Sequence, residues 1–269
     1  MISIIIPTLN EEKLLPRLLE DIKKQTYTDY EIIVADANST DRTREIAEQF
    51  GSRVTDGGLP GVGRNNGAKI ARGEYFIFFD SDITIKEDFL ENAFNEFQEK
   101  YLDVATCSYF PDSDEYKNWF DVYNSYARVV QFIRPSCGGA FIFTTRRMFE
   151  RIEGFDESLK LAEDHNFVKR ASKYGKFRIL ESVSLILSVR RFDKEGIIKF
   201  VSRALQSEIH RSFFGEIKND RFKYELGNYN VDKKSFMKQK SKLKKIILQF
   251  KKTQKERAAI RKTKKKSGK

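Results

Sequence analysis

Short apolar runs alternate with amphipathic stretches along residues 1–214 of this chain. Residues 2–6, 31–35 and 75–79 are almost uninterrupted apolar runs, which is the pattern of strands that are covered on both faces of a sheet. Between the first two runs, leucine and isoleucine recur at helical spacing over residues 14–22, and two lysines follow. This alternation predicts βαβ units and therefore an α/β fold with a mostly parallel sheet.

The same alternation continues along the rest of these residues. We expect further strands at residues 103–110, 138–144 and 177–187, the last as one strand or two. We expect helices at residues 41–50, 65–71, 114–132, 161–174 and 196–214, and one after residue 79 with Phe89, Ala93 and Phe97 on one stripe. Asn10 is expected to begin the first helix, and the glycines of residues 57–63 are expected to form a loop.

Polar clusters occupy the positions where a ligand site is expected. They lie at residues 7–12, 36–41, 64–67 and 80–82, after strands or after the glycine-rich stretch. In an open α/β sheet the ligand binds beyond the carboxyl ends of the strands. Any one cluster could be a capped turn, but four that open on the same edge favour a binding site.

The last of these clusters, Asp80-Ser81-Asp82, has the chemistry of a metal site. Mg²⁺ prefers oxygen ligands and keeps open positions for substrate phosphates. A divalent ion that bridges a diphosphate there would neutralise the charge of a leaving group. An Asp-x-Asp pair by itself is also consistent with a solvated turn, so this prediction depends on the other clusters.

Charge is distributed unevenly along the chain, whose formal net charge is +11. Residues 233–269 contain 17 Lys and Arg and one acid, which gives +16, whereas residues 1–232 carry a net −5. We expect an amphipathic basic helix at about residues 234–252 and a disordered end, a pattern typical of segments that bind anionic membranes. The chain is therefore predicted to divide into a domain at residues 1–215 and a basic extension at 216–269.

Other segments exclude several classes of protein. Cys107 and Cys137 form no CxxC motif, so neither a disulfide framework nor a zinc cluster is indicated. We find neither a signal-peptide pattern nor the ~20 apolar residues of a spanning helix. The expected location is therefore the cytoplasm, at the cytoplasmic face of the membrane.

Taken together, the motifs resemble those of family 2 glycosyltransferases with the GT-A fold. The matching segments occur in family order over residues 1–170: Ile6-Pro-Thr-Leu-Asn-Glu-Glu12, Asp36 with Ser39-Thr-Asp-Arg-Thr43, Arg64-Asn-Asn-Gly-Ala68, Asp80-Ser-Asp82, Gly138-Gly-Ala-Phe141 and Glu163-Asp164. The ordered set is specific, although no single motif is. The resemblance implies a single-domain GT-A-like fold and a nucleotide-diphosphate sugar as donor.

The resemblance also implies roles for individual residues. The residues implied to bind the nucleotide sugar are Pro7, Thr8, Glu11, Asp36, Arg64 and Asp80, with Asp36 reading the base. Asp82, with Asp80, is implied to bind Mg²⁺ or Mn²⁺. Asp164 is implied to be the catalytic base, with Glu163 beside it.

Further residues are implied to lie on the acceptor side. Gly138 and Gly139 resemble the turn at which acceptor and donor approach, and Arg190 and Arg191 resemble a double-arginine segment of small family members. Arginine forks suit a diphosphate or a lipid phosphate. His165 could tune the base or reach the metal, but a lone histidine is more often a structural residue, and we favour that role.

We therefore expect an inverting, metal-dependent transfer of a single sugar to an acceptor that is lipid-linked or another glycan. The Gln-x-x-Arg-Trp motif of processive synthases is absent, since the only tryptophan is Trp119. A nucleic-acid-binding protein is the first alternative, but it would spread basic residues over its folded surface, and no nucleic acid is expected. A sugar-phosphate nucleotidyltransferase is the second, but it would carry a glycine-rich loop after the first strand, where residues 7–12 contain no glycine.

Overall fold

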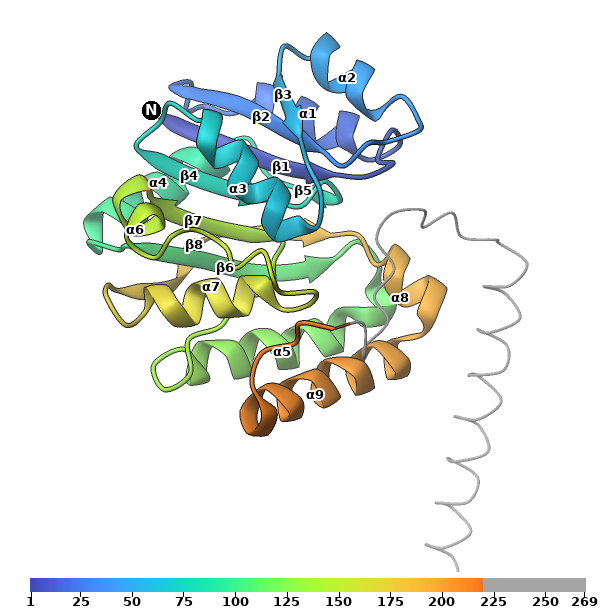
Figure 1. Cartoon of the computed structure of the whole chain (residues 1–269), viewed down its shortest axis with the longest axis vertical. Helices are drawn as coiled ribbons and strands as arrows, with labels where there is room; N and C mark the ends of the chain where they lie inside the picture. Colours follow the sequence, from blue (N-terminus) through green and yellow to red (C-terminus); the bar gives the residue numbers. More distant parts are fainter. Residues whose placement is uncertain (220–269) are drawn as a thin grey trace, which may run out of the picture. The chain divides into compact units, whose positions relative to one another are not determined.

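A computed structural model of the chain describes residues 1–219 (Figure 1). These residues fall into two compact units, one formed by residues 1–189 and 203–219 and the other by residues 190–202. The second unit contains α8 (Arg190–Glu195) and the beginning of α9 (Ile197–Phe214). None of the helices among the described residues has the length and apolar character that a membrane crossing requires. The predicted tail helix at about 234–252 lies outside the described residues, and the domain boundary at residue 215 stays a prediction.

Four parallel strands form one half of an eight-stranded sheet, in the order β3-β2-β1-β4. They are β1 (Ile2–Thr8), β2 (Tyr30–Asp36), β3 (Arg53–Asp56) and β4 (Tyr75–Phe79). The helices between them are α1 (Leu15–Lys23), α2 (Thr43–Gln49) and α3 (Pro60–Ile70). Because these strands are parallel, the segments that follow them emerge at one edge of the sheet.

The antiparallel strand β7 (Phe141–Thr145) joins this half to the other, in the order β4-β7-β6-β8-β5. The remaining strands are β5 (Ile83–Thr84), β6 (Val104–Pro111) and β8 (Phe177–Leu187), and β6 is parallel to β8. Besides residues 203–214 of α9, the remaining helices of this unit are α4 (Phe89–Glu99), the 3₁₀ turn η1 (Asp114–Tyr116), α5 (Lys117–Val130), α6 (Arg146–Arg151) and α7 (Glu163–Ala171). The prediction of a mostly parallel sheet flanked by helices is confirmed.

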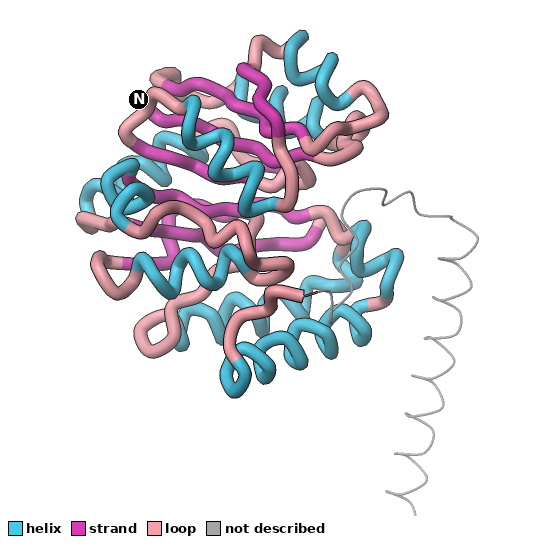
Figure 2. Tube along the Cα trace, in the orientation of Figure 1, coloured by secondary structure: helices cyan, strands magenta, loops and turns pink. Residues whose placement is uncertain are grey.

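Phenylalanines fill the layers between the sheet and its helices. Figures 1 and 2 show α3 and α7 over the near face of the sheet. On that side the ring of Phe78 lies 5.0 Å from that of Phe155, which in turn stacks on Phe167 of α7 at 4.4 Å. The next residue of β4, Phe79, points to the other face and contacts Phe89 of α4. An apolar strand such as β4 is thus covered on both faces, as its sequence predicts.

The first helix was expected to begin at Asn10, and this prediction is wrong. The helix begins at Leu15, and Asn10 adopts a left-handed backbone conformation with φ 56°. Its side-chain oxygen accepts a hydrogen bond from the backbone N–H of Thr40, 2.9 Å away. Asparagine tolerates this conformation better than most residues, so Asn10 joins two loops instead of capping a helix.

The predicted loop at residues 57–63 is shorter than expected, because α3 begins at Pro60 and contains Gly61 and Gly63. These glycines allow a close approach between elements. A Cβ atom on Gly63 would lie 3.2 Å from the Cβ of Pro7, and one on Gly67 would lie 2.4 Å from Cγ2 of Ile5. Gly63, which was predicted to lie in a loop, and Gly67 therefore allow α3 to lie close to β1.

Several short elements were not predicted from the sequence. They are β3, β5, α6 and α8. β3 has no apolar run, and its pairing with β2 defines it as a strand. β7 begins at Phe141 instead of residue 138, because Gly138 and Gly139 belong to the segment that leads into the strand. Elements this short depend on partners that are distant in the sequence.

Gly67→Ala is expected to lower the free energy of unfolding by about 1–3 kcal/mol, because the new methyl group would overlap Ile5 in a packed layer. Gly61→Ala is the matched control in the same helix, since its nearest neighbour would be Cγ of Glu163 at an ordinary 3.4 Å. This control should be neutral or slightly stabilising, because alanine favours helices over glycine. Urea denaturation of both variants measures the difference, and equal stability would contradict the packing argument.

Candidate active site

The loops that follow β1 and β2 are joined to each other by hydrogen bonds. The backbone N–H of Asn10 donates to Oγ of Ser39 at 2.8 Å, and that of Glu11 donates to Oγ1 of Thr43 at 2.7 Å. Glu11 is buried. These cross-links order the two loops at the carboxyl edge of the sheet before any ligand is present.

Asp36 lies at the end of β2 and is almost completely buried. Its carboxylate accepts hydrogen bonds from Oγ of Ser39 at 2.5 Å and from the backbone N–H of Ser39 at 3.1 Å. Thr8, which pairs with Asp36 in the sheet, donates its hydroxyl at 3.3 Å. Pro7, Thr8, Glu11 and Asp36 are therefore brought to one corner of the edge, as expected of a shared binding site.

Arg64 connects three segments that are far apart in the sequence. Its side chain projects from α3 and is only 2% exposed. Nη1 donates to Oε1 of Glu163 at 2.7 Å, and Nη2 donates to Oδ1 of Asp80 at 2.9 Å. Nη2 also lies 3.2 Å from the carbonyl oxygen of Gly139. One guanidinium thus holds together the end of β4, the approach to β7 and the first turn of α7.

The environment of Arg64 keeps it charged. Burial alone would lower the pKa of the guanidinium, but the carboxylates of Asp80, Glu163 and Asp164 raise it above its ordinary value. The ring of Phe155 lies 5.3 Å below the guanidinium carbon. Nε is buried and has no hydrogen-bond partner among the described residues. The ion pairs therefore determine where Arg64 lies.

The two predicted catalytic acids begin α7, after Ala162 in a left-handed conformation with φ 61°. Oδ1 of Asp164 accepts a hydrogen bond from the backbone N–H of His165 at 2.7 Å. A Cβ atom on Gly139 would lie 2.9 Å from Oδ2 of Asp164. A side chain at residue 139 would therefore require the Asp164 carboxylate to move from its present position. Glu163 is turned toward Arg64 instead, so the two neighbouring acids have different partners.

Asp82 is half-buried near the end of β4, and its backbone carbonyl accepts a hydrogen bond from Ser188 at 3.0 Å. Asp82 lines a cavity of about 10 Å³ together with Arg17 and Asp112. Among the described residues, no group of three or more His, Cys, Asp or Glu side chains is arranged to hold a metal ion. One or two carboxylates are nevertheless the usual protein ligands of an Mg²⁺ that also binds substrate phosphates. Asp82 and Asp80 therefore fit a metal that arrives with a diphosphate.

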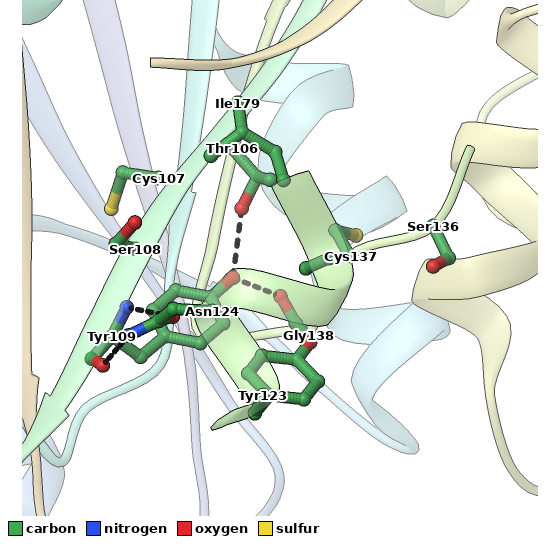
Figure 3. Close-up of a pocket in the computed structure, with 11 residues that line it drawn as sticks. Thr106, Cys107, Ser108, Tyr109, Tyr123, Asn124, Ser136, Cys137, Gly138 and Ile179 are labelled. Carbon is green, nitrogen blue, oxygen red and sulfur yellow. Dashed lines mark hydrogen bonds between the residues drawn. The ribbon is translucent and has the colours of Figure 1, made fainter. Parts of the chain in front are cut away.

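Two tyrosines that the sequence analysis missed support the Gly138 turn (Figure 3). The hydroxyl of Tyr109 donates to the Gly138 carbonyl oxygen at 2.5 Å and lies 2.8 Å from Oγ1 of Thr106. The ring of Tyr123 of α5 stacks on that of Tyr109, with 6.4 Å between the ring centroids. Nothing in the sequence connects these tyrosines with Gly138, because the connection is made by tertiary packing.

The same tyrosines line a cavity of about 10 Å³. Figure 3 shows Cys137 and Gly138 on one side of it and the residues of β6 on the other. Burial raises the pKa of the Cys137 thiol well above its ordinary value, so this cysteine stays protonated. Because a single water needs about 10–15 Å³, the cavity is part of the wall of the site and is too small for a substrate.

Arg190 and Arg191 begin α8 in the second compact unit. Their predicted place on the acceptor side stays a prediction. In the first unit, four of the other residues predicted for the site lie close to Arg64. They are Asp80, Gly139, Glu163 and Asp164.

A family model for glycosyl transferase family 2 matches residues 3–165, which is more than half of the chain. The chain belongs to glycosyl transferase family 2. The matched region includes Arg64 and every carboxylate that it contacts.

Relatives within this family have similar sequences over most of the chain. The uncharacterized glycosyltransferase EpsJ of Bacillus subtilis is 28% identical over 207 residues, which cover 69% of this chain and 58% of EpsJ. TarS of Staphylococcus aureus, a poly(ribitol-phosphate) β-N-acetylglucosaminyltransferase, is 28% identical over 235 residues, which cover 81% of this chain and 40% of TarS. The chain thus spans less than two thirds of either relative.

Solved structures of two glycosyltransferases have the same fold. TarS 1-349 in complex with UDP-GlcNAc superposes with a TM-score of 0.60 at 22% identity, over 79% of this chain and 73% of that one. The mannosyltransferase PcManGT from Pyrobaculum calidifontis, in complex with GDP-Man and Mn²⁺, gives 0.59 at 20% identity, over 76% and 64%. The predicted GT-A-like fold is confirmed for this member of glycosyl transferase family 2.

Proposed function

We propose that this protein transfers a single sugar from a nucleotide-diphosphate sugar to an acceptor hydroxyl or phosphate, with inversion at the sugar. The observation that carries the proposal is the Arg64 cluster, in which one guanidinium contacts both Asp80 and Glu163. Asp80 lies beside the proposed metal ligand Asp82, and Glu163 lies beside the proposed base Asp164. Arg64 therefore couples the donor half of the site to the acceptor half, as a direct displacement requires.

The donor half has the residues needed to bind a nucleotide. Asp36 lies where a carboxylate can accept from a base N–H or a ribose hydroxyl, with Pro7, Thr8 and Glu11 along the same edge. Loops that are already ordered lose little conformational entropy when a ligand binds. Relatives include one complex with UDP-GlcNAc and another with GDP-Man. We infer a nucleotide sugar as the donor class.

Asp82 and Asp80 would hold a divalent metal ion, Mg²⁺ or Mn²⁺. When bound with the donor, such an ion would supply positive charge to the leaving diphosphate. The protein's part is to present half-buried carboxylate oxygens at the end of β4. Since Arg64 already occupies one oxygen of Asp80, Asp82 is the better candidate for a direct ligand.

Asp164 would act as the general base. Its Oδ1 is held by the N–H of His165, while Oδ2 faces the space beside Gly139. Oδ2 would accept the proton of the acceptor hydroxyl as the acceptor oxygen forms a bond to the anomeric carbon. The bond from that carbon to the diphosphate breaks on the opposite face, and its electron pair leaves with the diphosphate. Glu163, which is paired with Arg64, would keep the turn in place.

The acceptor is proposed to be a glycan or a lipid-linked molecule, with the protein peripheral at the cytoplasmic face of the membrane. The support for this is the basic charge of residues 233–269 and the Arg190-Arg191 pair, which suits a phosphate. No specific observation favours the nucleic-acid-binding or nucleotidyltransferase alternatives.

A donor screen tests the proposed function. With Mn²⁺ present, one of the UDP-, GDP- or dTDP-sugars is expected to stabilise the protein by about 2.7 kcal/mol at a hundred times its Kd. Asp82→Ala should remove the metal-dependent part of this shift and abolish transfer, because the diphosphate would lose its charge partner. The exposed Asp88→Asn is the matched control and should retain both. If the donor stabilised the wild type and Asp82→Ala equally, whether or not metal is present, the proposed role of Asp82 would be contradicted.

A further inference from the structure

The chain turns back after α9 and lies against the segment that leads into α7. α9 ends at Phe214, and Gly215 has φ 89°, a left-handed conformation that glycine adopts readily. The next residues run beside α7 (Figure 1). Ile217 is 1% exposed, and its carbonyl oxygen accepts a hydrogen bond from the backbone N–H of Lys160 at 3.0 Å. Residues 215–217 are called the return segment below.

Arg211 and Glu216 form the charged centre of this turn. The Arg211 side chain lies near the end of α9 and is 7% exposed, and its Nε donates to Oε2 of Glu216 at 2.8 Å. Its Nη1 donates to Oε2 of Glu208 at 3.1 Å. Oε1 of Glu216 lies 3.7 Å from Nζ of Lys169 in α7. A chain of opposite charges therefore connects α9 with α7.

These charges lie close to the proposed base, Asp164. Burial alone would lower the pKa of the Arg211 guanidinium, but the carboxylates of α9 and the return segment, together with Asp164, raise it above its ordinary value. Asp164 acts in the same direction on the pKa of Arg64. Two buried arginines, one from α3 and one from α9, are therefore within electrostatic reach of the base, and each is hydrogen-bonded to other carboxylates.

The position of the first turn of α7 depends on contacts with other segments. The first N–H groups of a helix have no partner in a preceding turn, and the residue before α7 is left-handed. The helix by itself therefore does not fix how the chain enters it. Arg64 holds the turn through Glu163. The return segment holds it at positions before and after the base, through its contacts with Lys160 and Lys169.

We propose that Arg211 and Glu216 are positioning residues for the Asp164 base, and that they act through the return segment on the first turn of α7. A general base must lie within hydrogen-bond distance of the hydroxyl whose proton it accepts. A displacement of about 1 Å can lower a rate about a hundredfold. The role of the pair in transfer rests on the proposed function, whereas its effect on the order of α7 does not.

Arg211→Met removes the charge and the hydrogen bonds of the arginine and retains an unbranched apolar side chain. We expect kcat for sugar transfer to fall about 10–100-fold, while the KM for the donor changes less than about twofold. The donor KM should hold because the loops after β1 and β2 are joined to each other. Arg211→Lys should recover part of the rate, because it keeps the charge without the geometry of the guanidinium.

Glu216→Gln tests the other member of the pair with little change in shape. It should show the same separation of kcat from KM to a smaller extent, and it carries the test if Arg211→Met does not fold. The double variant Arg211→Met, Glu216→Gln should be no slower than Arg211→Met alone, because residues that act as one unit have effects that do not add.

Two control variants separate positioning from a general loss of stability. Ile22 is completely buried at the last turn of α1, and Ile22→Ala leaves a cavity that lowers the melting temperature. Below the onset of unfolding, its kcat should equal the wild-type value. Arg147→Met, at an exposed position of α6, is the control for the loss of an arginine and should retain both kcat and melting temperature.

Hydrogen–deuterium exchange gives a second measurement that needs neither donor nor acceptor. In Arg211→Met the amides of residues 158–167 should exchange at least about tenfold faster than in the wild type, because the contacts that order this segment are lost. The amides of β4 in the same protein provide the internal reference. Arg147→Met should exchange as the wild type does over both segments.

Two results would overturn the proposal. One is a kcat in Arg211→Met as high as that of Ile22→Ala, which would make the pair a structural contact only. The other is unchanged exchange over residues 158–167 in Arg211→Met. Turnover near the wild-type value in Asp164→Asn is a separate result: it would remove the proposed function, and with it the role of the pair in transfer, even where the exchange of residues 158–167 changes.

Discussion

Asp164→Asn is expected to lower the rate of sugar transfer by about 10²–10⁴-fold while the nucleotide sugar still binds. The amide cannot accept the proton of the acceptor hydroxyl, and a positioned base contributes a factor of this size. The substitution retains the shape of the side chain, and the amide oxygen can still accept from the N–H of His165. The fold and the donor half of the site should therefore survive.

The measurement is release of nucleoside diphosphate from the stabilising donor in the presence of acceptor, with a thermal-shift assay for donor binding. Glu163→Gln is an informative comparison, because Glu163 is paired with Arg64. That variant should lose stability as well as rate, whereas Asp164→Asn should lose rate alone. Turnover near the wild-type value in Asp164→Asn would rule out Asp164 as the base.

Arg64→Met is expected to lower the free energy of unfolding by about 3–5 kcal/mol, because it leaves the carboxylates around a buried position without their positive partner. Asp80, Glu163 and Asp164 would then repel one another across the space that the guanidinium occupied. Urea denaturation measures the effect. Transfer should also fall, since nothing would hold Asp80 and Glu163 at their present separation.

Arg44→Met provides the control for the loss of an arginine. Arg44 is half exposed and pairs with Glu48 at 3.7 Å, and an exposed pair of this kind contributes little. Arg64→Lys should give an intermediate result, because an ammonium keeps the charge but cannot contact two carboxylates in the geometry of a guanidinium. If Arg64→Met were as stable as Arg44→Met, the buried cluster would not hold the site together.

The sequence predicted the elements of the sheet well where strands are long and apolar. The strand predicted at residues 75–79 matches β4 in its bounds, since a run of five apolar residues can only be buried on both faces. The short strands β3 and β5 were missed, because their residues become strands through pairing. Asn10 was misassigned because the same residue type caps helices and tolerates a left-handed conformation.

How the members of the site divide their contacts could not be predicted from the sequence. Glu163 and Asp164 are adjacent acids with the same chemistry, yet one pairs with Arg64 and the other faces Gly139. Tyr109 and Tyr123 were missed for the same reason, because the cavity that they line together with Gly138 joins residues that are distant in the sequence.

The sequence by itself determined the alternation of apolar strands and amphipathic helices, the ordered motifs of glycosyl transferase family 2, and the separation of a basic tail from an acidic body. Periodicity and charge are local properties that can be counted along a chain. Only the tertiary structure decided that Arg64 is buried among carboxylates from three segments, and that Arg211 pairs with Glu216 beside α7. Both depend on which elements pack together, because burial is a property of the folded molecule and the same arginine could equally have faced the solvent.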